Sequence, residues 1–301
     1  MTSSIQYLSR KQIDTNKWDA CIGKAENGLI YAYSFYLDHM AKQWDALVLN
    51  DYEAVMPLPW NSKYGIRYIY QPFLTAQLGV FGLRADELTD DFINAIPSSF
   101  RLIELSLNSG NKPTAHITSR SNYILELGQS YEVLYNNYRE NIQRNIKKAF
   151  QLGCTVQKDP DVEKLIGLAL AQMKMHNKES SENADRFRKL YSFLHDKKMA
   201  STYGIISTKN ELLASCAFFF SHDRAYYILV GNHPDGRNSG ASHALIDAFI
   251  KDHAGKKMVL DFEGSDIRNL AFFYSGFGAE HVSYTALKIN RLPFYLKWMK
   301  K

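Results

Sequence analysis

A strand-like apolar run followed by a helical pattern marks the second half of the chain. The run, Ala225–Val230, ends at a polar turn of Arg237, Asn238, Ser239, Gly240, Ala241 and Ser242. Apolar residues then recur every three or four positions as far as Phe249, which predicts a helix that begins near Gly240 and has one buried face. The first amide groups of a helix have no partner inside it, so the turn offers a site for an anion such as a pyrophosphate.

The rest of the chain predicts two halves with one order of elements: two helices, three strands, a loop, a helix and a strand. The first half has helices at 16–24, 34–43 and 86–96 and strands at 46–49, 52–59, 67–70, 102–107, 116–118 and 123–127. The second half has helices at 131–150, 162–173, 187–194, 240–253 and 268–275 and strands at 202–207, 212–220, 225–231, 258–261 and 282–289. This echo suggests a duplicated fold, with a boundary at residues 128–130.

Length and composition narrow the class of protein. A chain of 301 residues exceeds the usual size of one hydrophobic core, so we expect two domains. No apolar run reaches the ~18 residues of a membrane span, and the N-terminus lacks a signal-peptide pattern, so we expect a cytoplasmic protein. Three widely spaced cysteines suit free thiols, and neither they nor the histidines have a metal-ligand spacing. The net charge of +5 hardly distinguishes partners.

The turn resembles the pyrophosphate-binding segment of the GNAT acyltransferases, whose pattern is Gln or Arg, two residues, Gly, one residue, then Gly or Ala. Here it reads Arg237, Gly240 and Ser242, and the serine departs from the pattern. The resemblance implies that the turn residues, 237–242, bind acyl-CoA. It also implies that backbone amides of Leu229, Val230 and Gly231 polarise the thioester carbonyl. An ordinary strand-to-helix turn is the alternative.

The element order of the whole chain resembles the Fem-type family of tandem GNAT-like transferases. This resemblance implies an α/β (α+β) fold of two GNAT-like domains, 1–128 and 129–301, each with a mixed, mainly antiparallel sheet flanked by helices. In the first half, the loop 71–79 has no Arg before its Gly at the phosphate-binding spacing. We therefore expect a degenerate N-terminal domain and a C-terminal domain that holds acyl-CoA.

Three residues are candidates for the chemistry. Tyr274 stands four residues before Gly278, and the GNAT resemblance implies that its hydroxyl faces the CoA sulfur, where it would protonate the departing thiolate. A tyrosine packed between helix and sheet is the alternative. Asp261 and Glu263 lie two apart at the end of a predicted buried strand, and one of them would take the proton of an attacking amine. Alternatively, they bind backbone amides or a nearby Arg.

A basic helical segment carries Arg139, Arg144, Lys147 and Lys148, and the last three share a face. Fem-type enzymes carry a similar helix, which implies an anionic acceptor or tRNA; a solvated face is the alternative. The leading hypothesis is transfer of an acyl group, acetyl in the first instance, from acyl-CoA to a small-molecule or peptide amine, with no metal. The alternatives are aminoacyl-tRNA-dependent addition of an amino acid to a peptidoglycan precursor, or a binding protein without catalysis.

Overall fold

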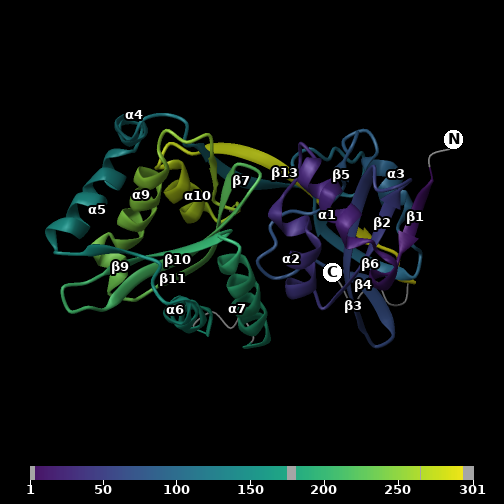
Figure 1. Ribbon diagram of the computed structural model, residues 1–301, viewed down its shortest axis with the longest axis horizontal. Helices are drawn as coiled ribbons and strands as arrows, with labels where there is room; N and C mark the ends of the chain where they lie inside the picture. The colour runs from purple at the N-terminus through teal and green to yellow at the C-terminus, as the bar shows by residue number, and fades with distance from the viewer. Residues whose placement is uncertain (1–3, 175–180, 265, 294–301) are drawn as a thin grey trace. The chain divides into compact units, whose positions relative to one another are not determined.

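The computed structural model describes residues 4–174, 181–264 and 266–293 (Figure 1). The chain forms two compact units: residues 1–120 with 283–301 make unit 1, and residues 121–282 make unit 2. The boundary expected after residue 128 thus lies within unit 2. The expected second domain also ran to residue 301, whereas β13 (Glu280–Asn290) pairs with β6 (Phe100–Ser106) from Ala286 onward, because its hydrogen-bonding partner is a unit 1 strand.

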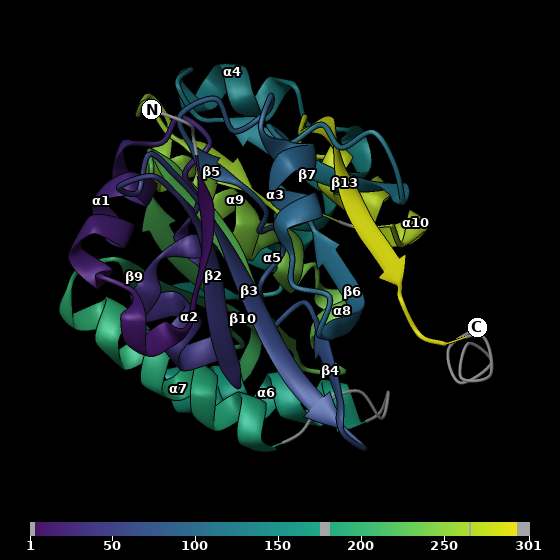
Figure 2. The ribbon, with the colours of Figure 1, turned by 90° about the vertical axis from the view of Figure 1, so that its right-hand side faces the viewer.

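Unit 1 contains one sheet with helices on both faces. Its strand order is β1-β2-β3-β4-β6-β13, with β5 paired to β3, and every pair is antiparallel except β4 with β6. Figure 2 shows α1 and α2 on one side of β2 and β3 and α3 on the other. The other elements are β1 (Ile5–Leu8), α1 (Thr15–Lys24), α2 (Ser34–Met40), β2 (Gln43–Leu49), β3 (Ala54–Lys63), β4 (Ile66–Ile69), β5 (Phe81–Gly82), α3 (Thr89–Ala95) and short 3-10 turns at Arg10–Gln12 and Ile30–Ala32.

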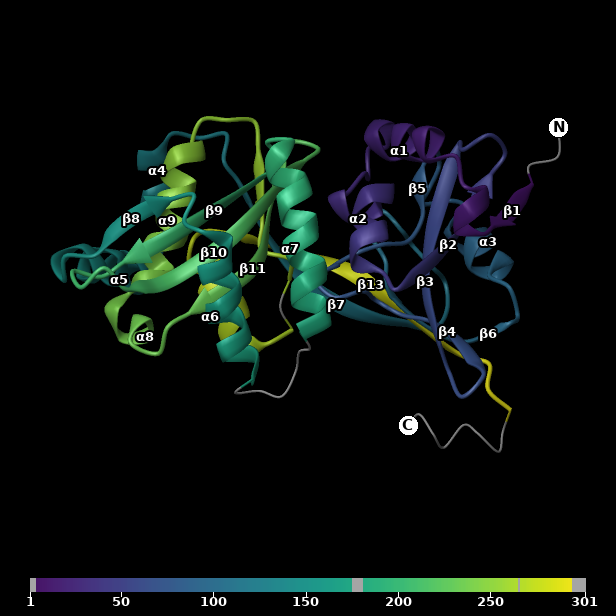
Figure 3. The same ribbon diagram turned by 60° about the horizontal axis from the view of Figure 1, so that its bottom comes forward.

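Unit 2 has the strand order β7-β12-β11-β10-β9-β8, in which β11 and β12 are parallel and the other pairs antiparallel. Figures 1 and 3 show α6 and α7 on one face of this sheet and α5, α9 and α10 on the other. The elements are β7 (Ile117–Glu126), α4 (Tyr131–Asn136), α5 (Glu140–Gln151), β8 (Thr155–Lys158), α6 (Val162–Lys174), α7 (Ser181–Asp196), β9 (Ala200–Ile206), β10 (Leu212–Ser221), β11 (Arg224–Asn232), α8 (Gly236–Ser239), α9 (Ala241–His253), β12 (Val259–Asp261) and α10 (Arg268–Ser275).

The predicted fold class is confirmed: the sheets are mixed and mainly antiparallel, with helices on their faces. Both units also run in the same order, which is two helices, three antiparallel strands, a helix and a parallel strand. The periodic residues of α9 form its buried face, since Ala241, Ala244, Leu245 and Phe249 are at most 1% exposed. Phe249 stacks on Phe218 of β10 and joins the helix to the sheet.

In unit 1, the loop that follows β4 is hydrogen-bonded to the end of β6. In the loop 71–79, the amide of Leu78 donates to the carbonyl of Ser106, and the amide of Asn108 donates to the carbonyl of Leu78, each at 2.7 Å. The Gln71 side chain accepts from the Ser106 amide as well. The loop therefore extends the strand pairing of β6. That unit 1 is a degenerate copy of unit 2 stays a prediction.

Candidate functional site

The two parallel strands of unit 2 pair over a short length and then diverge. Pairing runs from Arg224 with Val259 to Tyr226 with Asp261, whereas β11 continues as far as Asn232. On its other side, β11 stays paired with β10, but the register shifts so that Ile228 has no partner. Such a bulge bends the strand and frees a local backbone group. The candidate site is the region beside the second half of β11, which the predicted residues Leu229, Val230 and Gly231 occupy.

Close packing of β11 against α6 requires a glycine at position 231. A Cβ atom there would lie 2.6 Å from Cβ of Leu168 and 2.9 Å from the backbone nitrogen of Ala169, both on α6. Leu229 is buried and Val230 half-buried. The strand is thus held firmly against α6 at the place where it separates from β12.

The polar turn forms the short helix α8, then Gly240, then α9. Arg237 and Asn238 are exposed, and Arg237 makes no ion pair with any residue that the structure describes. The Ser239 hydroxyl donates to the carbonyl of Gly236 at 2.9 Å. The Ser242 hydroxyl donates to Oδ1 of Asn232 at 2.7 Å and ties the start of α9 to the end of β11. All six predicted turn residues therefore lie at one end of the unit 2 sheet, next to the diverging strand.

Gly240 has a structural function that the sequence pattern did not reveal. Its φ is +81°, and a Cβ atom on it would lie 2.1 Å from the carbonyl oxygen of Asn145 in α5. A Cβ atom on Gly276, after α10, would lie 2.8 Å from side-chain carbons of Ile142 in α5. The backbone of α5 therefore passes close to the start of α9, and a side chain of α5 packs against the chain just after α10.

The cations of α5 are on its exposed face. Arg144, Lys147 and Lys148 are exposed and make no ion pair with a described residue. Arg139, which precedes α5, stacks its guanidinium 4.5 Å from the centre of the Phe272 ring and donates to the Phe272 carbonyl. The sequence prediction of a shared basic face is therefore matched by a solvent-facing group of cations next to the turn.

Tyr274 lies in a cluster of aromatic side chains beside the diverging strands. Its ring stacks on Phe262 with centroids 4.6 Å apart and meets Tyr227 of β11 edge-on at 6.3 Å. Burial raises the pKa of its hydroxyl, and the nearby Glu263 carboxylate raises it further. The hydroxyl makes no hydrogen bond with any described residue and stays protonated at neutral pH. Tyr274 and Glu263 are thus brought together, as residues of one site must be.

Asp261 has a full set of hydrogen bonds. Its buried carboxylate accepts from Nδ2 of Asn122 at 2.9 Å, from a guanidinium nitrogen of Arg224 at 2.7 Å and from the amide of Glu263 at 2.8 Å. This geometry matches the alternative in which Asp261 binds an amide and a nearby Arg. It fixes the turn at Glu263, whose φ is +62°.

His243 belongs to the same neighbourhood and was not among the predicted site residues. Its ring meets Phe273 of α10 edge-on, with centroids 4.9 Å apart. Burial lowers its pKa to about 4, so the imidazole is neutral at pH 7. The sequence signal was its position three residues after Gly240, but the contact with α10 is a long-range feature that spacing does not reveal.

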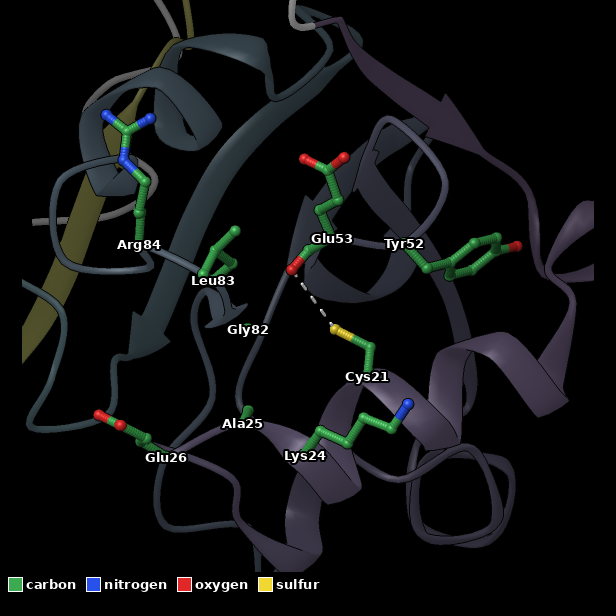
Figure 4. A pocket seen from close by; sticks show the side chains of 9 residues that line it. All are labelled: Cys21, Lys24, Ala25, Glu26, Tyr52, Glu53, Gly82, Leu83 and Arg84. Carbon is green, nitrogen blue, oxygen red and sulfur yellow. Dashed lines mark hydrogen bonds between the residues drawn. The ribbon is translucent and has the colours of Figure 1, made fainter.

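Unit 1 holds a separate cavity of about 440 Å³ that contains none of the predicted site residues (Figure 4). Cys21 reaches into it from α1, and its Sγ lies 3.9 Å from the carbonyl oxygen of Glu53. Burial raises the pKa of this thiol to about 11, so it is not a thiolate nucleophile at neutral pH. Lys24 and Arg84 provide cations, and Glu26 and Glu53 provide anions. The cavity has no excess of either charge.

Residues 4–174, 181–264 and 266–293 include no helix that is long and apolar enough to cross a membrane. Within the same ranges, no group of three or more His, Cys, Asp or Glu side chains is arranged to hold a metal ion. All three cysteines are free thiols.

A family model matches part of unit 2. Residues 136–267 match the model of the acetyltransferase (GNAT) domain, a range that includes α5, the diverging strands and the turn. No curated protein matches the chain in sequence.

Solved structures reproduce the fold at low sequence identity. FemX is 12% identical, with a TM-score of 0.63 over 93% of this chain and 96% of its own. The C-terminal domain of a putative lysylphosphatidylglycerol synthetase from Agrobacterium fabrum is 9% identical, with a TM-score of 0.57 over 92% of each chain. A fungal chain with a GCN5-related glucosamine N-acetyltransferase region is 11% identical, with a TM-score of 0.50 over 96% of this chain and 38% of its own. Residues 136–267 therefore match a GNAT acetyltransferase domain, and the chain has a fold similar to that of FemX.

Proposed function

We propose that this protein is an N-acyltransferase that moves an acyl group, acetyl in the simplest case, from acyl-CoA to an amine by direct attack. The observation that carries the proposal is the divergence of β11 from β12 after Tyr226, next to the start of α9 and to Tyr274. In this proposal, one region supplies the three groups that the transfer needs: an anion site at the start of α9, strand backbone that is not paired with β12, and a protonated phenol.

The donor would lie along the second half of β11. Its diphosphate would meet the first amides of α9, at Ala241 and Ser242, where the helix dipole favours negative charge. Arg237 is exposed and free of ion pairs with described residues, so its guanidinium is available to the same phosphates. The thioester carbonyl would then lie near the bulge at Ile228, where those amides among Leu229, Val230 and Gly231 that point away from β10 would polarise it.

The chemistry is attack of the amine nitrogen on the thioester carbon, followed by loss of the CoA thiolate. Tyr274 would give its proton to the departing sulfur, since its hydroxyl has no described hydrogen-bond partner and is protonated at neutral pH. The acceptor is a small-molecule or peptide amine in its unprotonated form. The phenylalanines around Tyr274 would keep water from the thioester.

The test is incubation of the purified protein with acetyl-CoA and a panel of primary amines. A colorimetric thiol assay measures the released CoA, and mass spectrometry detects the acetylated product. Amine-dependent thiol release with a matching acetylated product is expected. Binding of acetyl-CoA without turnover of any amine would favour the alternative of a binding protein. No binding of acetyl-CoA or CoA would contradict the proposal.

A second candidate, aminoacyl-tRNA as the donor, is favoured by the basic face of α5. Arg144, Lys147 and Lys148 lie on the helix that contacts Gly240, so an RNA backbone on this face would be next to the turn. Reversal of the three residues to Glu is then expected to weaken tRNA binding and to reduce its salt dependence, because fewer counterions are released. Gel shifts in rising salt measure this. A parent protein that binds no tRNA excludes this donor.

A further inference from the structure

His243 places an imidazole without a described hydrogen-bond partner inside the candidate site. It is the third residue of α9, and its ring lies against Phe273 at 4.9 Å and near Phe277 at 6.4 Å. Neither ring nitrogen bonds to a residue that the structure describes.

The position of His243 links the two halves of the site. Gly240, at the start of the same helix, is the centre of the anion-binding turn. Phe273, which the imidazole contacts, is followed by Tyr274, and these two rings are 5.7 Å apart. A single phenylalanine therefore separates the imidazole from the phenol that would protonate the leaving group.

The imidazole is a proton acceptor at neutral pH. Burial alone lowers the pKa of His243 to about 4, with no contribution from a charged side chain. The imidazole contacts Phe273 of α10 and lies near Phe277, which follows α10, while Asn145 of α5 lies beside Gly240 at the start of the same helix. The nearest titratable group on α10 is Tyr274, which is protonated. The lone pair of His243 is thus free of competition from a salt bridge.

Of the two carboxylates predicted at this end of β12, Asp261 is already engaged in other contacts. It accepts three hydrogen bonds, one of them from the Arg224 guanidinium. His243 makes no hydrogen bond with a residue that the structure describes.

We propose that His243 accepts the proton of the attacking amine, an inference that rests on the proposed acyl transfer. The nitrogen–carbon bond forms first and leaves positive charge on the nitrogen, which makes its proton acidic enough for a weakly basic imidazole. The carbon–sulfur bond then breaks, and Tyr274 gives its proton to the sulfur. The imidazolium loses its proton to the tyrosinate, directly or through water, and both groups return to their starting forms. The substrate class is an unprotonated primary amine.

The test compares His243→Phe with His253→Phe. His253 is on the same helix, is half-buried with its pKa lowered by burial, and stacks on Phe249 at 4.1 Å, but it lies at the other end of α9. Phenylalanine keeps the ring volume in both variants. With acetyl-CoA and the amine found by the panel, His243→Phe is expected to lower kcat by ~100-fold with little change in KM for acetyl-CoA or in melting temperature. His253→Phe is expected to keep the parent kcat.

The pH profile and rescue separate chemistry from packing. For His243→Phe, kcat is expected to rise steadily with pH as hydroxide replaces the lost base, whereas the parent profile is flat from about pH 6 upward. Added imidazole is expected to restore activity to His243→Ala, which has room for it. A second readout is the ring-nitrogen NMR signal of His243, which should shift when CoA is added while that of His253 does not.

Each outcome decides the inference. A kcat of His243→Phe within twofold of the control, with the parent pH profile, overturns the role of His243 and leaves acyl transfer standing. A ring-nitrogen NMR signal of His243 that does not shift when CoA is added also overturns the proposed role of His243. A parent protein without turnover of acetyl-CoA overturns the proposed function and this inference together.

Discussion

Burial shifts the pKa of two titratable side chains around the candidate site. It raises the pKa of the Tyr274 hydroxyl, which keeps its proton at pH 7 as an ordinary tyrosine does, and it lowers the pKa of the His243 imidazole to about 4. One group can therefore donate a proton and the other can accept one, which are the two roles of a general acid and a general base.

Tyr274→Phe tests the acid. The variant keeps the ring that stacks on Phe262 but removes the proton, so turnover is expected to fall by ~100-fold at neutral pH with unchanged acetyl-CoA affinity. The deficit should shrink as pH rises past about 8.5, the ordinary pKa of a thiol, because the thiolate then leaves without protonation. Turnover within twofold of the parent at neutral pH would assign Tyr274 to packing alone.

Asp247→Asn is expected to stabilise unit 2 at neutral pH. Asp247 is 4% exposed within α9, and burial raises its pKa although the Tyr131 hydroxyl donates to it at 3.0 Å. A raised folded-state pKa means that the parent gains stability as pH falls through that pKa, so the advantage of Asn should be present at pH 7 and vanish near pH 4. Melting curves across this range measure it.

Asp252→Asn is the matched control on the same helix, and its expected effect on stability has the opposite sign. Burial raises the pKa of Asp252, but hydrogen bonds from Lys158 and Tyr203 outweigh burial and lower it. Its stability contribution is present above the unfolded-state pKa and is lost as pH falls through the lowered value. The substitution should therefore destabilise at pH 7. The same sign for both variants would contradict this account of the two carboxylates.

At the scale of elements, sequence periodicity did not predict where α5 begins. The apolar spacing from residue 131 to 150 predicted one helix, whereas the structure has α4, a break, and α5. The break follows from a long-range bond: the amide of Arg139 donates to the carbonyl of Gly276 at 2.9 Å. No local pattern reveals such a partner.

Gly240→Ala tests the contact between α5 and the start of α9. Alanine would take a left-handed backbone, at a cost of about 1–2 kcal/mol, and would place Cβ 2.1 Å from the Asn145 oxygen. Gly255→Ala is the matched control, because its φ of +77° imposes the same strain while no atom lies within 4 Å. Urea unfolding should show a larger loss in the free energy of unfolding for Gly240→Ala than for Gly255→Ala. Equal losses would mean that α5 moves away from the added methyl group without a loss of stability.

Regular elements were predicted where burial is periodic. The buried face of α9 and the strands β9 to β11 follow their patterns, since the helix buries its periodic residues and the strands are buried along almost their whole length. β8 was missed because its pattern is almost wholly exposed. β7 was predicted as two strands because the residues between them, 119–122, are polar in sequence. The basic C-terminal tail from residue 294 lies outside the described residues.

At the scale of the whole molecule, the two units share one order of elements but differ where a donor would bind. In unit 1 the loop 71–79 is hydrogen-bonded along β6, whereas in unit 2 the strand β11 runs free of β12 and leads to the turn at Gly240. Gly240 is preceded by an arginine, Arg237, at the pyrophosphate-binding spacing, whereas Gly79 is not. This difference in sequence predicted the asymmetry between the units. The contacts that close the unit 1 loop could not be predicted, because they join residues far apart in the chain.

The central claim is that acyl-CoA binds at the start of α9, and calorimetric titration of CoA tests it most directly. Ser242→Glu adds a carboxylate to the first turn of a helix, where it suits the helix dipole but would repel a diphosphate. Gln157→Glu makes the same charge change on exposed β8. The account predicts that the parent and Gln157→Glu bind CoA equally and that Ser242→Glu, folded but without the hydrogen bond from Ser242 to Asn232, binds at least ~10-fold more weakly. Equal affinity of all three proteins for CoA would contradict it.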